Sequence, residues 1–252
     1  MTPKLIAFGV VAFVVSLIIT VPAQLAGPYL LPAHVHAAGL EGTVWQGKAN
    51  RLQVWGFDLG AVSWDLQPLA LFLGRLQSEV SIDRPDLQGQ GTIAVGLGTF
   101  RFVNMHMTGQ AEVLAPLLIA YGVSIDGSLE ANIQTVEVTD RGPQAADGAI
   151  MWREARLVRP VALALGDVNV TVRQDGDKAV ADLKNTGDTL HLAGGARLQP
   201  DWKYDARLRI EPTDTTPKDV RNTLALLGRP DPNGAITLSQ QGTLFPVLAG
   251  AE

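Results

Sequence analysis

Apolar and polar residues alternate along most of this chain beyond residue 39. Within residues 39–82, for example, Val62, Trp64 and Leu66 lie two positions apart and polar residues separate them. Because successive side chains of a β-strand point to opposite faces, a period of two predicts strands. Glycines interrupt the alternation where turns or bulges need positive φ: Gly42, Gly47, Gly56 and Gly60. We therefore predict that residues 39–82 form a β-meander of short strands.

Further strands are predicted wherever the alternation resumes downstream. Residues 92–97 and 100–107 are expected to pair as a hairpin through Gly98 and Thr99. Similar runs predict strands at residues 168–172, 179–183, 189–198, 204–210 and 234–238. The pattern as a whole predicts a mainly β fold.

Short helices are predicted where the alternation breaks. They begin at or near proline, which suits the first turn of a helix, and they end at or before glycine. Their predicted positions are residues 68–74, which start at Pro68 and close at Gly74, residues 116–121 and residues 217–227. In the last of them we predict that Thr216 is the N-cap and that Asp219 completes a capping box.

Landmarks of the meander recur downstream in the same order. Three stretches, beginning near residues 40, 59 and 68, recur at offsets of 85, 88 and 92. Loop insertions leave such a growing offset, so we predict an internal duplication, with repeat 1 at about residues 39–110 and repeat 2 at about 122–211. The equivalent residues are Gly127 for Gly42, Gly148 for Gly60 and Trp152 for Trp64. A C-terminal helix and strand, residues 216–252, follow the second repeat.

An uncharged apolar run of seventeen residues, LIAFGVVAFVVSLIITV, occupies residues 5–21. At about 1.5 Å per residue it spans most of a hydrocarbon core of about 30 Å, so we predict a transmembrane anchor. Lys4 favours a cytoplasmic amino terminus, which places the rest of the chain across the membrane. Apolar positions distributed along the run are Leu5, Phe8, Val14, Leu17 and Val21.

A cleaved signal peptide is the alternative interpretation of this run. The run is longer than the roughly 7–15 residues of a signal core, and Pro22 lies within the would-be cleavage site, so the anchor is favoured. Residues 23–38 are predicted to be a linker with a short helical turn at residues 28–31. Its Tyr29 would lie at the depth of the lipid headgroups.

Charge and composition exclude several classes of partner and site. The formal net charge is −5 and the two signs are intermixed, so no basic run is available for nucleic acid. The chain has no cysteine, which excludes disulfides, thiolate zinc sites and cysteine nucleophiles.

No motif predicts catalysis, a metal or a cofactor. The stretch GQGTIA at residues 89–94 fits a dinucleotide fingerprint by letter, but a strand pattern follows where a helix would have to begin. The carboxylates fall mostly in turns, and no serine lies in a nucleophile elbow. The histidines lack further ligands nearby and are expected to be surface or interface residues: His34, His36, His106 and His191.

The tryptophans have two interpretations, as aromatic rings that stack on a ligand or as core residues. The equivalent places of Trp64 and Trp152 in the two predicted repeats favour core packing. The remaining tryptophans are Trp45, Trp55 and Trp202.

The stretches GTVWQGKA at residues 42–49 and LGAVSWDLQPLALFLGRL at residues 59–76 resemble the signature region of the type II secretion system protein N family. The match covers about a sixth of the chain, and an amino-terminal membrane segment fits the same family. The resemblance implies a non-enzymatic, single-pass inner-membrane subunit that takes part in protein export through contacts with other subunits in the periplasm. It supplies no catalytic residues. The residues that carry the match include Gly42, Trp45, Gly47, Gly60, Trp64, Pro68 and Gly74.

The predicted architecture is a transmembrane helix followed by a duplicated antiparallel meander with about three short helices. Such a meander forms a curved sheet that is trough-like or barrel-like. A concave apolar surface would hold lipid tails or an apolar partner segment, in the manner of the β-groove domains of AsmA-type envelope proteins, which it resembles in pattern. Binding or transfer of lipid in the bacterial envelope is therefore the alternative function.

Overall fold

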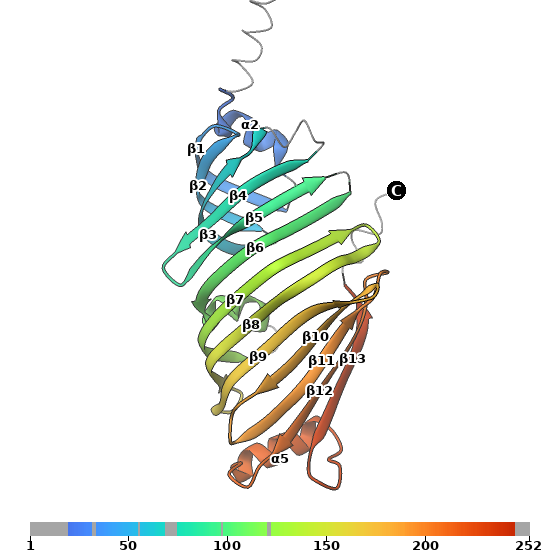
Figure 1. Cartoon of the computed structure of the whole chain (residues 1–252). Helices are drawn as coiled ribbons and strands as arrows, with labels where there is room; N and C mark the ends of the chain where they lie inside the picture. Colours follow the sequence, from blue (N-terminus) through green and yellow to red (C-terminus); the bar gives the residue numbers. More distant parts are fainter. Residues whose placement is uncertain are drawn as a thin grey trace, which may run out of the picture. The chain divides into compact units, whose positions relative to one another are not determined.

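The computed structural model of the 252-residue chain describes residues 20–31, 34–54, 56–68, 75–96, 98–119 and 122–244. The chain divides into two compact units, residues 1–85 and 86–252, and each unit is described by itself. In both units antiparallel strands dominate and only short helices accompany them (Figure 1). The predicted mainly β class is therefore confirmed.

The first unit is a four-stranded antiparallel meander with a helix beside its first strand. The strands pair in chain order, and Trp64 in the third strand has Gly47 and Val80 as its register partners in the second and fourth. The predicted meander is thus confirmed. Its elements are α2 (Ala23–Leu30), β1 (Val35–Gly42), β2 (Gln46–Val54), β3 (Phe57–Leu66) and β4 (Leu76–Arg84).

The segment predicted as a linker, residues 23–38, is mostly regular structure. Helix α2 begins at Ala23, five residues before the predicted helical turn, and β1 already begins at Val35. The sequence Ala-Gln-Leu-Ala that opens α2 consists of strong helix formers, which explains the earlier start. Of the helix predicted at residues 68–74, only Pro68 is described, and it is helical; Gly74 lies outside the described residues.

The second unit contains nine strands and the other helices among its described residues. The hairpin predicted through Gly98 and Thr99 is confirmed, since Gly96 and Thr99 are register partners at its tip. The strands are β5 (Leu87–Gly96), β6 (Thr99–Gln110), β7 (Ser124–Thr139), β8 (Gly142–Arg159), β9 (Leu163–Asp175), β10 (Lys178–Asn185), β11 (Leu190–Leu198), β12 (Lys203–Pro212) and β13 (Ile236–Thr243). The helices are η1 (Ala111–Leu114), α4 (Ala115–Leu118) and α5 (Lys218–Leu227).

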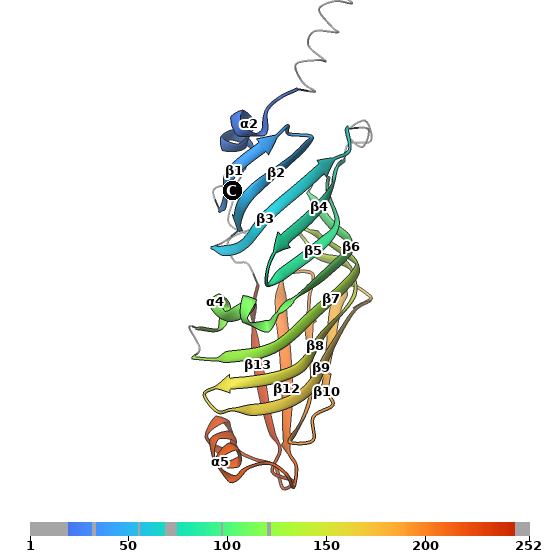
Figure 2. The ribbon, with the colours of Figure 1, turned by 90° about the vertical axis from the view of Figure 1, so that its left-hand side faces the viewer.

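The strands of the second unit form one curved, open antiparallel sheet. Each strand from β5 to β13 pairs with its neighbours in chain order. In Figure 2, β7 to β9 lie nearer the viewer than β12 and β13, and α4 and α5 both lie on the inner side of the curve. Among the described strands of this unit β13 pairs with β12 alone, so the sheet does not close on itself. Of the two predicted forms, the trough-like one is correct for this unit.

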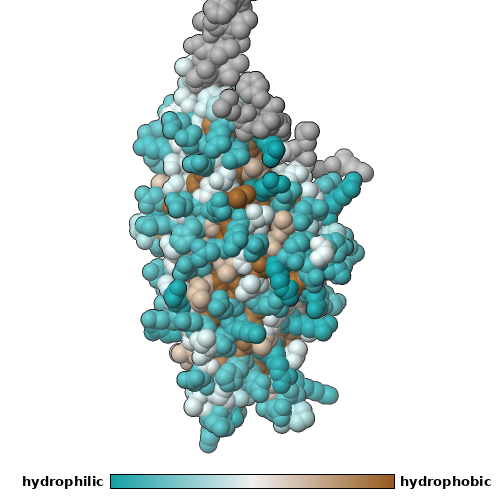
Figure 3. Space-filling model, viewed as in Figure 1, coloured by the Kyte–Doolittle hydropathy of each residue, from teal (hydrophilic) through white to brown (hydrophobic). Residues whose placement is uncertain are grey.

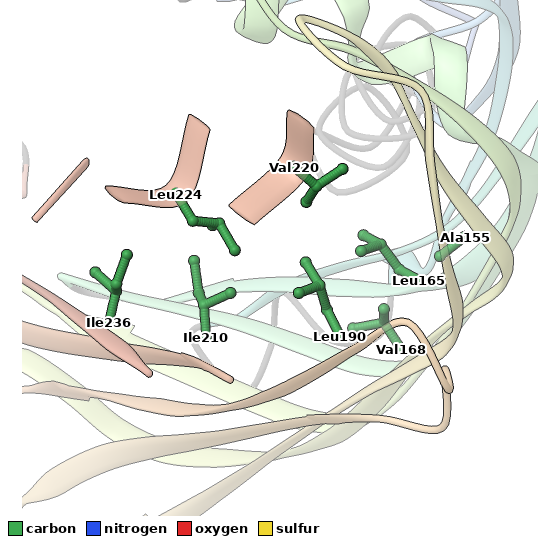
Figure 4. Close-up of a cluster of buried hydrophobic side chains, with 8 residues drawn as sticks. All are labelled: Ala155, Leu165, Val168, Leu190, Ile210, Val220, Leu224 and Ile236. Atoms are coloured by element: carbon green, nitrogen blue, oxygen red, sulfur yellow. The ribbon is translucent and has the colours of Figure 1, made fainter. Parts of the chain in front are cut away.

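Helix α5 covers one end of the inner side of this sheet. Its Val220 and Leu224 point toward Leu190, Ile210 and Ile236 of the strands, and all five side chains are buried (Figure 4). Burial of one such aliphatic side chain stabilises the fold by about 2 kcal/mol. Because the strands of this cluster range from β8 to β13, the cluster joins segments that are distant in sequence.

The loop before α5 fastens the helix to the sheet, in a way that differs from the prediction. Thr216 does not cap α5: the N-cap is Pro217, and no side chain caps the helix. The buried hydroxyl of Thr216 instead donates to the carbonyl of Thr189 and accepts the backbone N–H of Thr213. The hydroxyl of Thr215 likewise donates to the carbonyl of Asp188. The predicted capping role of Thr216 was wrong because its hydroxyl bonds to the carbonyl of Thr189, a partner distant in sequence.

One other local prediction is corrected. The helix predicted from Pro116 begins earlier, as η1 from Ala111 runs directly into α4, and the buried side chains of Ala111 and Val113 fix this first turn. Residues 160–166, the repeat counterpart of residues 68–74, are not helical. They enter β9 at Leu163, and pairing with β8 satisfies their backbone groups.

Residues 5–19 of the predicted transmembrane run, residues 5–21, lie outside the described residues. Among the residues that the structure does describe, no helix has the length and apolar character needed to cross a bilayer.

Candidate functional site

The inner face of the second unit carries a continuous band of apolar residues. Strand pairing aligns one residue from each strand into a row that crosses the sheet, and two adjacent rows are apolar. The first row, from β6 to β13, is Met107, Ala131, Ile150, Val170, Leu183, Gly194, Leu208 and Leu238. The second is Met105, Ile133, Gly148, Val172, Ala181, Ala196 and Ala206, and its first polar member is Gln240 on β13. At about 4.8 Å between strands, the first row is about 34 Å long.

Helix α5 covers only part of this band. Leu183, Leu208 and Leu238 of the first row pack against the cluster beneath α5, whereas the second row does not belong to that cluster. Met105, Ile133 and most other members of the second row remain partly accessible to solvent. A band of this kind offers no side-chain hydrogen-bond partner, so an extended peptide laid on it would leave its backbone groups unsatisfied. Hydrocarbon chains, or the apolar side of a helix, match its chemistry.

The outer face of the same sheet is polar. The row between the two apolar rows points outward and consists of His106, Asn132, Ala149, Thr171, Asp182, Gly195, Arg207 and Ser239. Figure 3 shows this side of the unit, where hydrophilic side chains predominate over β6 to β10. The alternation in sequence therefore separates the sheet into one apolar and one polar face.

Hydrogen bonds and ion pairs link the polar side chains across the outer face. The Nδ1 atom of His106 lies 2.6 Å from Oδ1 of Asn132, and Asn132 donates to Glu130 at 3.1 Å. Glu130 also accepts from Arg153 at 3.1 Å. The amide of Asn132, followed by the Arg153 guanidinium, lowers the pKa of Glu130. The carboxylate stays ionised at neutral pH, whereas a general acid needs its pKa raised.

Charged residues also surround a hollow of about 410 Å³ on the outer face, over β10 to β13. The buried side chain of Val180 and the glycines of β11 lie in its lining. Arg207 and Arg209, which line it too, already pair with Asp205 at 3.5 Å and with Asp231 at 2.8 Å. The Arg209 guanidinium, followed by the backbone N–H of Ala235, lowers the pKa of Asp231. Because both signs of charge are present, the hollow does not form an anion site.

Trp64, predicted to be a core residue, packs against glycine in the first unit. Its indole Nε1 donates to the carbonyl of Val44 at 3.0 Å. A Cβ atom on Gly47 would lie only 2.6 Å from the ring of Trp64, so the indole occupies the space that glycine leaves. Gly42, with φ +83°, ends β1, and Gly60, with φ +73°, lies where the register between β2 and β3 shifts.

Trp152 has a similar environment in the second unit. Its Nε1 donates to the carbonyl of Asp126 at 3.0 Å, and a Cβ atom on Gly127 would lie 2.8 Å from that nitrogen. Gly127 has φ +120° and interrupts the register of β7 with β8. Gly148, the third predicted counterpart, lies buried in β8 opposite Ile133. Each tryptophan is therefore partly buried and bonds to a backbone carbonyl near the preceding strand.

The other predicted residues do not gather into a site. Trp45 lies in the turn between β1 and β2, where its carbonyl accepts the N–H of Leu66 at 2.6 Å, and Trp55 is outside the described residues. Trp202 donates to the carbonyl of Asp140 at 3.3 Å. The described residues contain no cluster of histidine, aspartate and glutamate able to hold a metal. The glycine-rich stretch at residues 89–94 lies within β5, as its strand pattern predicts.

The apolar band depends on the pairing register between strands, which the alternation within a single strand does not reveal. Single strands show alternation, but only the pairing partners reveal that apolar positions of eight strands coincide in a row. Turn glycines such as Gly98 and Gly176, both with positive φ, were the available signal for register, because a tight turn fixes the pairing of its two strands.

Comparison with known proteins identifies the family. The family model for type II secretion system (T2SS) protein N matches residues 33–239, most of the chain. The chain belongs to the type II secretion system protein N family. The resemblance noted at residues 42–76 is thereby confirmed and extends over both units of the structure.

Individual relatives agree with this assignment. The chain is 31% identical over 239 residues to the type II secretion system protein N of Vibrio cholerae, and this alignment covers 91% of this chain and 93% of the relative. It is 27% identical to the protein N of Aeromonas hydrophila, over 94% of this chain and 97% of the relative. The protein N of Pectobacterium carotovorum is 26% identical, over 89% of this chain and 90% of the relative. No solved structure matches this chain.

Proposed function

We propose that this protein is a non-enzymatic subunit of the type II secretion system, held in the inner membrane by residues 5–21. Its β units would lie in the periplasm and act through contacts with other subunits. Membership of the protein N family carries this proposal, and the apolar run at the amino terminus supports the anchor. Tethering would confine the β units near other anchored subunits and so raise their effective concentration.

The outer edge of β13 supports contact with another protein. The N–H of Leu244 donates to the carbonyl of Trp202 at 2.8 Å, just beyond the pair of Lys203 with Thr243. Hydrogen-bonded pairs alternate along an antiparallel ladder, so the odd-numbered residues of β13 direct their backbone groups away from β12. Ser239 is at the centre of this edge, with which no other described strand pairs.

Strand β13 also lacks the usual protection of an edge. Its sequence, ITLSQQGT, contains no charged residue and no proline, although these residues commonly prevent an exposed edge from pairing. A strand from another subunit can therefore add to this edge, with main-chain hydrogen bonds as the principal attraction.

The experiment is complementation of a deletion strain. Deletion is expected to abolish secretion of type II substrates into the medium, and the wild-type chain or Ser239→Ala should restore it. Ser239→Pro should not, because proline removes an outward N–H while leaving the bonds of the even-numbered residues to β12 intact. Secretion and co-purification of inner-membrane subunits are measured together.

Two outcomes would contradict these proposals separately. Normal secretion after deletion, with no subunit co-purified, would reject the proposed function. Full activity of a stably expressed Ser239→Pro chain would reject the β13 edge as the contact and leave the function in place. Circular dichroism of the proline variant verifies that its strand content is unchanged.

Binding of lipid acyl chains is a second candidate function. The specific observation is the apolar band, whose two rows carry no polar side chain across β6 to β12. We propose that hydrocarbon chains occupy the part of the band that α5 leaves uncovered, near Ile133 and Val172. This function is compatible with a role in secretion.

Photocrosslinking tests the lipid proposal. The full-length chain is reconstituted with a phospholipid that carries a diazirine in its acyl chain, and adducts are mapped by mass spectrometry. Val172→Asp is expected to reduce adducts on the band about tenfold, because loss of one aliphatic contact weakens binding by about 1.5 kcal/mol. Thr171→Asp, the neighbouring position on the outer face, is the matched control and should have no effect. Adducts confined to residues 1–31 would exclude the proposal.

A further inference from the structure

Helix α2 exposes apolar side chains that no described part of the first unit covers. Leu25 is 69% exposed and Tyr29 is 89% exposed. These residues are four positions apart, so they share one side of the helix. Because the helix has no charge of its own, these two side chains form a small apolar patch on its surface.

The opposite side of α2 packs closely on β1. Ala23 is 4% exposed, and Gly27 is buried as well. A Cβ atom on Gly27 would approach Cδ1 of Leu40 to 2.6 Å, so the helix backbone lies directly against that strand. The orientation of α2 is therefore fixed by its buried side, and Leu25 and Tyr29 cannot turn inward without displacing it.

Charge is absent from the whole surrounding segment. Residues 5–40 contain no aspartate, glutamate, lysine or arginine. Water-facing helices ordinarily carry such residues on their outer side, whereas leucine and tyrosine are favourable at the boundary between headgroups and acyl chains. The chemistry of this surface matches a lipid interface better than bulk water.

The position of α2 along the chain selects the same partner. Ala23 follows the end of the predicted anchor, Val21, by two residues, a distance of at most about 7 Å along the chain. The headgroup layer on each side of the hydrocarbon core is about 5–8 Å thick. The carbonyl of Val21 accepts the N–H of Val44 at 3.0 Å, and Pro22 forms a bridge with Thr43, so the start of α2 is also attached to the β1–β2 turn.

We propose that α2 lies in the headgroup layer of the membrane that holds the anchor, with Leu25 and Tyr29 in contact with lipid. Through its packing on Leu40, the helix then holds the first unit against the bilayer surface, instead of leaving it on a free tether. This inference rests on the proposed membrane anchor and adds a second, orienting contact to it.

Spin labelling tests the contact directly. The chain has no cysteine, so single-cysteine variants can be labelled without any background. Leu25→Cys and Tyr29→Cys are labelled with a nitroxide in the full-length chain in phosphatidylethanolamine–phosphatidylglycerol liposomes. Lys48→Cys, whose side chain is 57% exposed on β2, is the water-exposed control. All three positions are exposed, so none of the substitutions disturbs the packing of the unit.

The ratio of oxygen to nickel-chelate accessibility is the measurement, because oxygen concentrates in lipid and the chelate in water. The ratio at positions 25 and 29 is expected to exceed that at position 48 by about tenfold, the equivalent of about 1.4 kcal/mol of differential partitioning. Equal ratios at the three positions would overturn the inference.

Whether the protein still floats with the liposomes after a carbonate wash distinguishes a failure of the α2 contact from a failure of the anchor. Chains that float but show water-exposed labels at positions 25 and 29 retain the anchor and reject only the role of α2. Chains that do not float reject the anchor and the inference together.

Discussion

Ile236→Ala is expected to lower the free energy of unfolding of the second unit by about 3 kcal/mol, a typical cost for removing a buried isoleucine side chain. Ile236 is only 1% exposed; it begins β13, the last strand of the sheet, and packs in the cluster beneath α5. Because β13 pairs with only one of the described strands, its attachment depends on this contact and on the ladder with β12. Urea unfolding of the purified full-length chain, followed by far-ultraviolet circular dichroism, measures the change.

Two matched variants give this experiment its controls. Ile236→Val keeps most of the side chain and should cost about 1 kcal/mol. Thr237→Ala changes the next residue, which is exposed on the outer face, and should cost less than about 0.5 kcal/mol. If Ile236→Ala were no more harmful than Thr237→Ala, the α5 cluster would not be a stabilising core.

Gly127→Ala is expected to lower the free energy of unfolding by more than about 2 kcal/mol. Its φ of +120° lies in a region that side chains strongly disfavour, which costs about 1–2 kcal/mol. The new methyl group would also lie 2.6 Å from the carbonyl oxygen of Arg153 and 2.8 Å from Nε1 of Trp152. Strand β7 must therefore shift at its bulge, and the indole must lose its hydrogen bond to Asp126.

Gly176→Ala isolates the backbone cost from the steric cost. Gly176 also has positive φ, at +62°, but a Cβ atom there meets nothing within 4 Å. This variant should cost about 1 kcal/mol, the penalty of the left-handed conformation alone. Tryptophan fluorescence should change in the Gly127 variant and stay constant in the Gly176 variant. Equal costs in the two variants would show that the space beside Trp152 is not limiting.

The internal duplication stays a proposal. The environments of Trp64 and Trp152 support it, because each indole donates to a carbonyl at 3.0 Å and each packs on a glycine. The third landmark differs from its counterpart, since Pro68 is helical whereas residues 163–166 belong to β9. We propose that repeats at about residues 39–110 and 122–211 diverged at this place. Their boundaries cross the division between the two compact units at residue 85, so repeat and unit are different divisions of the chain.

The sequence by itself determined the class of secondary structure and the two faces of each strand. A period of two needs no knowledge of partners, because it follows from the geometry of a single extended chain. Glycines and prolines marked most turns for the same reason, since they restrict φ locally. The family could also be recognised at this stage, from the short stretches around Trp45 and Trp64.

Tertiary structure decided everything that depends on a partner distant in sequence. Thr216 was predicted to cap the helix that follows it, but its hydroxyl bonds with Thr189 instead. Residues 163–166 have a pattern that suits either a short helix or a strand, and pairing with β8 selected the strand. The apolar band exists only because pairing brings apolar positions such as Ile150, Val170 and Leu183 into one row. Local preferences amount to tenths of a kcal/mol per residue, whereas each burial or ladder contact contributes about 1–2 kcal/mol, so the long-range partner prevails where the two conflict.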